Sequence, residues 1–337
     1  MVTYSLWDAP LQVSGVPFFQ EKQKLVRLPE ELIAQLPHLE HLGRRCSGGR
    51  VALKTDSPSF TVEVTLKTLT VDVGMSLFSA QGVQVMVGER ENARHLGVVN
   101  PPDYETKTFR ATFQKDPKLE QITLYFPRNE QLENIRIQLE DEARILPPTP
   151  YKYKKPVVFY GSSITEGGCA CCNTNSYPAI LSRWLDFDFY NLGFSGNAKG
   201  ELVMADYIST FDMGAFVYDY DHNAPSPEHL EQTHKPFFDR IRQAHPHLPI
   251  LMMTRPAEVY TPAMQKRRQI VKATYEAALS AGDRNVYFLD GEQFYGDRDR
   301  NLCSFDNCHP NDLGFYRMAC CIRPVLEKML KSSEVTE

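Results

Sequence analysis

The chain has 337 residues, of which 42% are hydrophobic and 23% are charged, and its formal net charge is −5. This composition is typical of a globular protein, and the mild negative charge gives no reason to expect a nucleic acid or a membrane as a partner. We expect no transmembrane helix, because no apolar run approaches the roughly 18 residues that a span requires. The length exceeds what one hydrophobic core usually supports, so two domains are expected.

The first part of the chain, residues 1–150, is predicted to be all-β. Apolar residues alternate with polar ones along 60–66, which is the period of a half-buried strand. The same period recurs at 83–87, 122–126 and 135–139. We therefore expect an antiparallel, jelly-roll-like sandwich. One helix is expected over 29–42, limited by its internal Pro37. The sandwich could simply pack against the following domain and form one wall of a substrate cleft; as an alternative, the loop 44–50, which is basic and interpreted as flexible, could reach that cleft.

The proline-rich segment 146–151 is predicted to be a stiff linker. After it, short apolar strands alternate with helical patterns. The expected strands are 157–160, 187–192, 215–220, 250–254 and 286–289, and the clearest helices are 262–280 and the C-terminal segment that begins after 310. This alternation predicts a five-stranded, doubly wound parallel sheet of the α/β class, flavodoxin-like in its layering. We therefore divide the chain into an accessory sandwich, 1–150, and a catalytic domain, 151–337.

Polar residues follow the expected strands. Gly161-Ser162-Ser163 ends the first, and an acid and a base three residues apart, Asp306 and His309, precede the last helix. Because ligands bind at the carboxyl ends of parallel strands, these residues are expected to meet at one edge of the sheet. Serine, histidine and aspartate are the three residue types of a Ser-His-Asp triad.

The order of these residues resembles a known family. Ser163, Gly196, Asn223 and His309 follow one another as in the four sequence blocks of the SGNH hydrolases, also called GDSL esterases, and the resemblance covers roughly 157–330. The usual Gly-Asp-Ser is here Gly161-Ser162-Ser163, and the third block lacks its usual neighbours around Asn223. The resemblance implies an α/β/α hydrolase fold, and the preceding sandwich is similar to that of bacterial carbohydrate esterases.

The family register favours Ser163 as the nucleophile over its neighbour Ser162, which could instead cap a helix. His309 would act as the base and Asp306 would hold its tautomer. His222 is a rival base that we interpret as a residue of the rim.

The backbone N–H of Ser163, the N–H of Gly196 and the side-chain amide of Asn223 would form the oxyanion hole, because neutral donors stabilise a developing negative charge. Asn197 is an alternative donor or a substrate ligand. Arg255 is a candidate for binding an anionic or sugar group, although it could equally be a solvated arginine at a strand end.

We expect neither a cofactor nor a metal ion. Zinc is an alternative for Cys169, Cys171 and Cys172 with Cys303 or Cys308, but their spacing is not that of a zinc finger or ribbon. Reduced thiols are the favoured interpretation, and a disulfide between the 169–172 and 303–308 loops is a further alternative.

The expected activity is that of a serine esterase acting on short-chain O-acyl esters, acetyl esters above all, with a glycan or small molecule as the alcohol portion. The alternatives are an acyltransferase with the same site and an inactive carbohydrate-binding protein. Because the chain begins without a signal peptide, we expect a cytoplasmic protein, or a periplasmic or secreted one if a leader has been removed.

Overall fold

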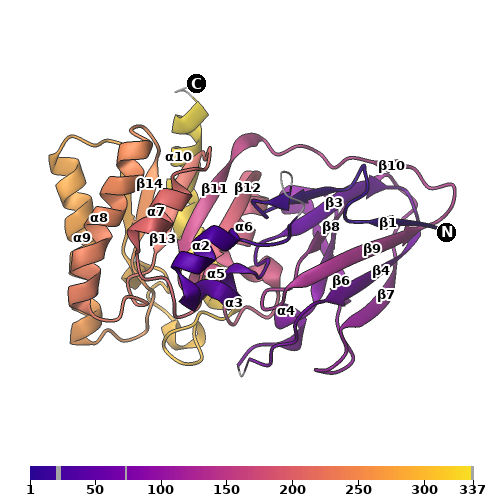
Figure 1. The fold of residues 1–337 in the computed structure, drawn as a ribbon, viewed down its shortest axis with the longest axis horizontal. Coiled ribbons are helices and arrows are strands. Elements are labelled where there is room, and N and C mark those ends of the chain that lie inside the picture. The colour runs from indigo at the N-terminus through magenta and orange to yellow at the C-terminus, as the bar shows by residue number, and fades with distance from the viewer. Residues whose placement is uncertain (20–23, 73, 335–337) are drawn as a thin grey trace.

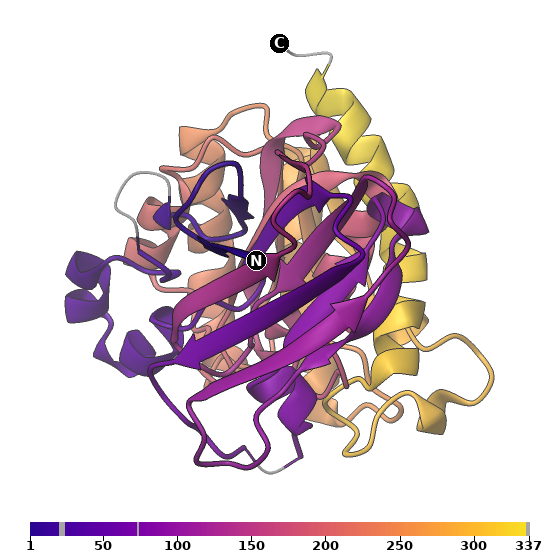
Figure 2. The same cartoon turned by 90° about the vertical axis from the view of Figure 1, so that its right-hand side faces the viewer.

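The computed structural model describes residues 1–19, 24–72 and 74–334. It consists of a β-sandwich and an α/β unit that lie side by side (Figure 1). Figure 2 looks onto the outer sheet of the sandwich, with the C-terminal helix α10 (yellow) at one side. Within the described ranges, no helix is both long and apolar enough to cross a bilayer.

The sandwich has two antiparallel sheets. One sheet has the order β1 (Val2–Ser5), β9 (Leu132–Leu139), β4 (Ser59–Leu66) and β7 (Thr108–Gln114). The other has the order β10 (Ile145–Leu146), β3 (Arg50–Thr55), β8 (Glu120–Tyr125), β5 (Val83–Val87) and β6 (Arg94–Val99), with β2 (Gln12–Ser14) paired to β3. The alternation of 60–66 is confirmed, since Phe60, Val62 and Val64 are fully buried between the sheets. Each such side chain contributes about 1.5–3 kcal/mol through burial.

The helix expected over 29–42 is split. It forms α2 (Glu30–Gln35), η1 (Pro37–Leu39) and α3 (Glu40–Gly43), with a break at Leu36. The cause is Pro37, because a residue before proline avoids the helical region, and Leu36 has φ −124° and ψ 65°. Two further short elements in this half are α4 (Leu77–Ala80) and η2 (Arg90–Asn92).

These N-terminal helices pack on the α/β unit rather than inside the sandwich. Leu28, Leu32 and Ile33 belong to the same buried cluster as Met204 and Ile208 of α7, and Figure 1 shows α2 (indigo) next to α7. The boundary near residue 150 therefore stays a prediction, because a segment before it completes the core of the unit after it.

The second unit contains the expected parallel sheet. Its order is β12 (Phe187–Gly193), β11 (Tyr153–Gly161), β13 (Ala215–Asp219), β14 (Ile250–Met253) and β15 (Val286–Leu289). The helices and turns between and after them are α5 (Ser163–Glu166), η3 (Asn173–Asn175), α6 (Tyr177–Leu185), α7 (Leu202–Ile208), α8 (Pro227–Ala244), α9 (Pro262–Ser280), η4 (Gly291–Gln293), η5 (Arg300–Leu302) and α10 (Asp312–Glu334). Helices α7, α8 and α9 cover one face, while α6 and α10 cover the other. Because β11 lies between β12 and β13, the chain direction across the sheet reverses at β11, where doubly wound sheets bind ligands.

The loop 44–50 does not reach a cleft, which corrects the expectation of a flexible basic loop. Arg50 is 1% exposed, pairs with Asp188 and stacks over the Phe189 ring at 4.4 Å. Arg45 is also buried. Both arginines are held at the junction of the two units, where an apolar stem and a planar guanidinium pack well.

Candidate active site

The strand β11 ends in two serines with different environments. Ser162 is fully buried and caps α5, since its Oγ accepts a hydrogen bond from Ile164 N at 3.1 Å. Ser163 is the first residue of α5, and its Oγ contacts His309 Nε2 at 2.9 Å. The position before them requires glycine, because a Cβ on Gly161 would overlap the Asp219 carboxylate. The hydroxyl next to the histidine is therefore that of Ser163.

The loop before α10 brings an acid to the same histidine. His309 Nδ1 donates to Asp306 Oδ2 at 2.7 Å. The other oxygen, Oδ1, accepts from the backbone N–H groups of His309 at 2.7 Å and Cys308 at 2.9 Å. With Nδ1 donating, Nε2 is free to accept the Ser163 proton. The three residue types expected at opposite ends of the catalytic segment form one continuous hydrogen-bonded chain.

The electrostatics keep the acid ionised beside the base. Burial alone would raise the pKa of Asp306, but its hydrogen bonds from His309 and Cys308 hold that pKa below the usual value. The Cys308 thiol raises the pKa of His309; burial opposes this effect and Asp306 adds to it. Asp306 is therefore ionised throughout the range in which the imidazole gains and loses its proton.

The three predicted oxyanion donors follow the ends of β11, β12 and β13. The N–H of Ser163 is at the start of α5, where backbone N–H groups have no partner inside the helix. Gly196 has φ +70° and lies in a turn closed by Asn197 N donating to Phe194 O at 2.8 Å. Asn223 Oδ1 accepts from Ala198 N at 3.4 Å, which leaves its Nδ2 as the outward donor.

The two candidate substrate ligands are engaged with the protein. Asn197 Nδ2 donates to Ser195 O at 2.8 Å. Arg255 Nη2 donates to Asn307 O at 2.7 Å, which links the loop after β14 to the loop that carries His309. Both side chains therefore hold loops of the site, and a direct contact with substrate stays a prediction for each.

Cys308 is a neighbour of the base that the sequence did not place in the site. It lies between His309 and His222, and although burial would raise its pKa, the two imidazoles lower it to about 6. His222 also has an acid partner, since its Nδ1 lies 3.4 Å from Asp221 Oδ1. Burial alone would lower the pKa of His222, but Asp221 and Cys308 raise it to about 9. The available signal was the position of Cys308 directly before the predicted base.

The thiols do not gather into a metal site. Across the described ranges, no group of three or more His, Cys, Asp or Glu side chains could hold a metal ion. Cys169 and Cys308, from the two loops that a disulfide could have joined, are both free thiols.

Family models match both parts of the chain. The model described as GDSL-like Lipase/Acylhydrolase family matches residues 154–327, and the model described as N-terminus of Esterase_SGNH_hydro-type matches residues 4–145. No curated protein matches the chain.

Solved structures share the whole fold at low identity. A GDSL-like lipase from Bacteroides ovatus is 24% identical with a TM-score of 0.86, and 98% of each chain is covered. The salicylyl-acyltransferase SsfX3 of a tetracycline biosynthetic pathway is 22% identical with a TM-score of 0.78, and 97% of each chain is covered. A family two carbohydrate esterase from Cellvibrio japonicus is 12% identical with a TM-score of 0.67, and 98% of each chain is covered. The α/β/α fold of SGNH type with its preceding sandwich is thereby confirmed, and the chain belongs to the GDSL-like lipase/acylhydrolase family, whose members act on ester bonds.

Proposed function

We propose that the protein is a serine esterase that removes short acyl groups, such as acetyl, from O-acylated carbohydrates. The observation that carries the proposal is the chain of hydrogen bonds from Ser163 through His309 to Asp306. The substrate class is supported by solved relatives of the same fold, which include an acetyl xylan esterase from Butyrivibrio proteoclasticus and a family two carbohydrate esterase from Clostridium thermocellum in complex with cellohexaose.

The proposed mechanism assigns one role to each side chain of the site. Ser163 Oγ attacks the ester carbonyl while its proton moves to His309 Nε2, and Asp306 stabilises the resulting imidazolium. The oxyanion accepts hydrogen bonds from Ser163 N, Gly196 N and Asn223 Nδ2. Collapse of this intermediate releases the alcohol, which takes the proton from His309. Water then attacks the acyl-enzyme while His309 takes its proton, and the second intermediate collapses to release the carboxylic acid as that proton passes to Ser163 Oγ.

The nucleophile is tested by hydrolysis of p-nitrophenyl acetate. Ser163→Ala is expected to lower kcat by roughly 10⁵-fold or more, since the triad acts as a unit. Ser162→Ala is the matched control, because it removes the neighbouring hydroxyl but only a helix cap, at a cost of about 0.5–2 kcal/mol in stability. Equal rates for Ser163→Ala and wild type would refute the assignment.

The substrate class is tested with acetylated xylo-oligosaccharides and p-nitrophenyl esters of increasing chain length. We expect kcat/KM to be highest for acetyl esters of sugars. A preference for long acyl chains would contradict the proposal. Labelling of Ser163 by a fluorophosphonate is also expected, and its absence would favour an inactive carbohydrate-binding protein.

A second candidate is an acyltransferase that passes the acyl group to an alcohol instead of water. The similarity to the salicylyl-acyltransferase SsfX3 over 97% of both chains favours considering it. The acyl-enzyme would form in the same way, and only the second nucleophile would differ. Product analysis with a competing alcohol separates the two, because a transferase yields mainly the new ester and an esterase mainly the free acid.

A further inference from the structure

A buried carboxylate connects the nucleophile's helix to the oxyanion loop. Glu166 lies on α5, in the same short helix as Ser163, and its side chain is fully buried. Its Oε2 accepts hydrogen bonds from the hydroxyl of Ser195 and from Ser195 N at 3.3 Å. Ser195 is the residue before Gly196. The carboxylate therefore holds the loop that supplies one of the proposed oxyanion donors.

The direction of the Gly196 N–H depends on this contact. A peptide unit is planar, so its carbonyl and its N–H point in opposite directions. In the unit that joins Ser195 to Gly196, the carbonyl accepts from Asn197 Nδ2 at 2.8 Å. Of the two central residues of this turn, only Gly196 has a positive φ, which is the type II pattern. Glu166 binds the N–H and the hydroxyl of Ser195, and Asn197 binds its carbonyl. The peptide unit between Ser195 and Gly196 therefore cannot rotate freely, and the Gly196 N–H has one orientation.

The N-terminal part of the chain binds the other carboxylate oxygen of Glu166. Arg27 Nη2 donates to Glu166 Oε1 at 2.9 Å, and the same guanidinium donates to Gly193 O at 2.6 Å and Asn191 O at 3.1 Å. It also lies over the Phe194 ring at 4.9 Å. Arg27 therefore contacts both Glu166 and the strand end that leads into the oxyanion loop.

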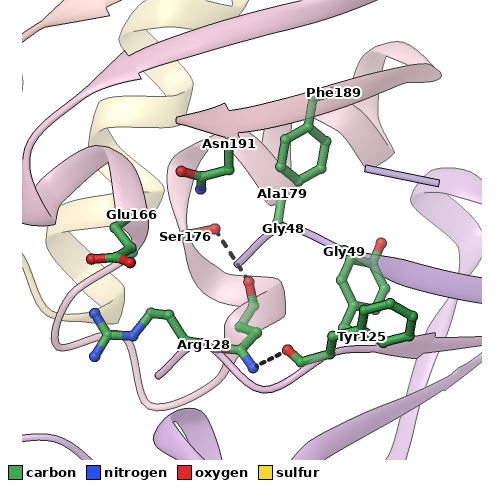
Figure 3. Close-up of a pocket in the computed structure, with 12 residues that line it drawn as sticks. Gly48, Gly49, Tyr125, Arg128, Glu166, Ser176, Ala179, Phe189 and Asn191 are labelled. Carbon is green, nitrogen blue, oxygen red and sulfur yellow. Dashed lines mark hydrogen bonds between the residues drawn. The ribbon is translucent and has the colours of Figure 1, made fainter. Parts of the chain in front are cut away.

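Other groups of the N-terminal part complete the surroundings of this carboxylate. Ser47 Oγ lies 3.2 Å from Glu166 Oε1 and donates to Arg128 O at 2.7 Å, and Figure 3 shows the Arg128 guanidinium facing Glu166 across a small cavity of about 10 Å³. Burial alone would raise the pKa of Glu166, but Arg27, Arg128 and Arg45 hold it below its usual value. The carboxylate is thus an ionised, fixed acceptor.

We propose that Glu166, held by Arg27, is a positioning residue for the oxyanion hole: it fixes Ser195 so that the Gly196 N–H faces the developing oxyanion. The inference rests on the proposed function and gives the N-terminal part a role in catalysis. A buried ion pair contributes little net stability compared with apolar packing, whereas a misaligned oxyanion donor lowers kcat directly.

The experiment compares two hydroxyls that contact the same carboxylate from opposite sides. Ser195→Ala removes the bond on the side of the oxyanion loop, while Ser47→Ala removes a contact on the opposite side, together with the bond to Arg128 O, and leaves that loop untouched. We expect Ser195→Ala to lower kcat on p-nitrophenyl acetate by about tenfold to a hundredfold, less than the loss of a whole donor. KM should change less than twofold, because the interaction strengthens in the transition state. Ser195→Thr, which keeps the hydroxyl, should restore most of the activity.

Ser47→Ala should retain the wild-type kcat with a thermal unfolding midpoint close to that of Ser195→Ala. Wild-type kcat in Ser195→Ala, or an equal loss in both alanine variants, would overturn the inference and leave Glu166 a structural ion pair. Failure of the proposed function is recognised separately, because wild type would then not hydrolyse p-nitrophenyl acetate, or Ser163→Ala would hydrolyse it at the wild-type rate.

Discussion

The exchange Asp306→Asn should disable the enzyme through the tautomer of His309. Asp306 Oδ1 accepts two backbone N–H groups, from Cys308 at 2.9 Å and His309 at 2.7 Å. In the variant, the amide oxygen of the new asparagine is expected to accept these same two hydrogen bonds. A flipped amide would lose both bonds, at about 0.5–1.5 kcal/mol each, and would place its NH₂ group against the backbone N–H groups. The amide NH₂ then faces His309 Nδ1, so the proton moves to Nε2 and the imidazole cannot accept one from Ser163.

The expected loss is about 10⁴-fold in kcat, as for a triad with the wrong tautomer, or about 5.5 kcal/mol in the activation free energy. Steady-state hydrolysis of p-nitrophenyl acetate measures it, with near-UV circular dichroism to confirm the fold. Asp306→Ala is the informative companion, because it removes the acid without imposing the wrong tautomer, and it should retain more activity than Asp306→Asn. If Asp306→Asn keeps more than a tenth of the wild-type kcat, the reasoning is wrong.

Two further predictions concern the same strand ends. Cys308→Ser should move the acidic limb of the kcat/KM profile to lower pH. His309 must be neutral to act as the base, and the Cys308 thiol raises the pKa of His309, so the loss of the thiol should lower that pKa. An unmoved limb would exclude this coupling, and the rate of alkylation of wild-type Cys308 by iodoacetamide should rise with pH around its pKa of about 6. Gly161→Ala should destabilise the fold by about 2–5 kcal/mol in urea unfolding, since the new methyl overlaps Asp219 and Thr165; a loss below about 1 kcal/mol would show that this strand end can adjust.

Local patterns were sufficient to predict most of the elements. The alternation along 60–66 and the helical spacing of 262–280 correspond to β4 and α9, because each pattern is set by the geometry of a single segment. The residues proposed for the triad could be named for a related reason. The resemblance to the SGNH hydrolases selected Ser163 and His309, and the geometry of a parallel sheet, whose carboxyl ends meet at one edge, predicted that they would converge.

The remaining features depend on pairs that are distant in sequence. The separation between Arg27 and Glu166 is 139 residues, and no periodicity links them. The burial of Arg50 depends on Asp188 in the other unit, so the charge of the loop 44–50 alone wrongly predicts a flexible segment. The lowered pKa of Cys308 requires His222 to fold back against it. Such contacts follow from the packing of two units, and composition carries no signal for them.

The packing of the N-terminal helices on α7 has a consequence for synthesis of the chain. Tyr207 OH donates to Arg27 O at 2.8 Å, and these residues are 180 positions apart. A ribosome adds roughly 5–20 residues per second, so about 10–40 seconds pass between the emergence of the two partners. During that interval the apolar side chains of Leu28 and Ile33 have no native surface to cover them. These residues are therefore made long before the surface on which they pack, and this enzyme is expected to depend on chaperones that shield the exposed apolar segment during synthesis.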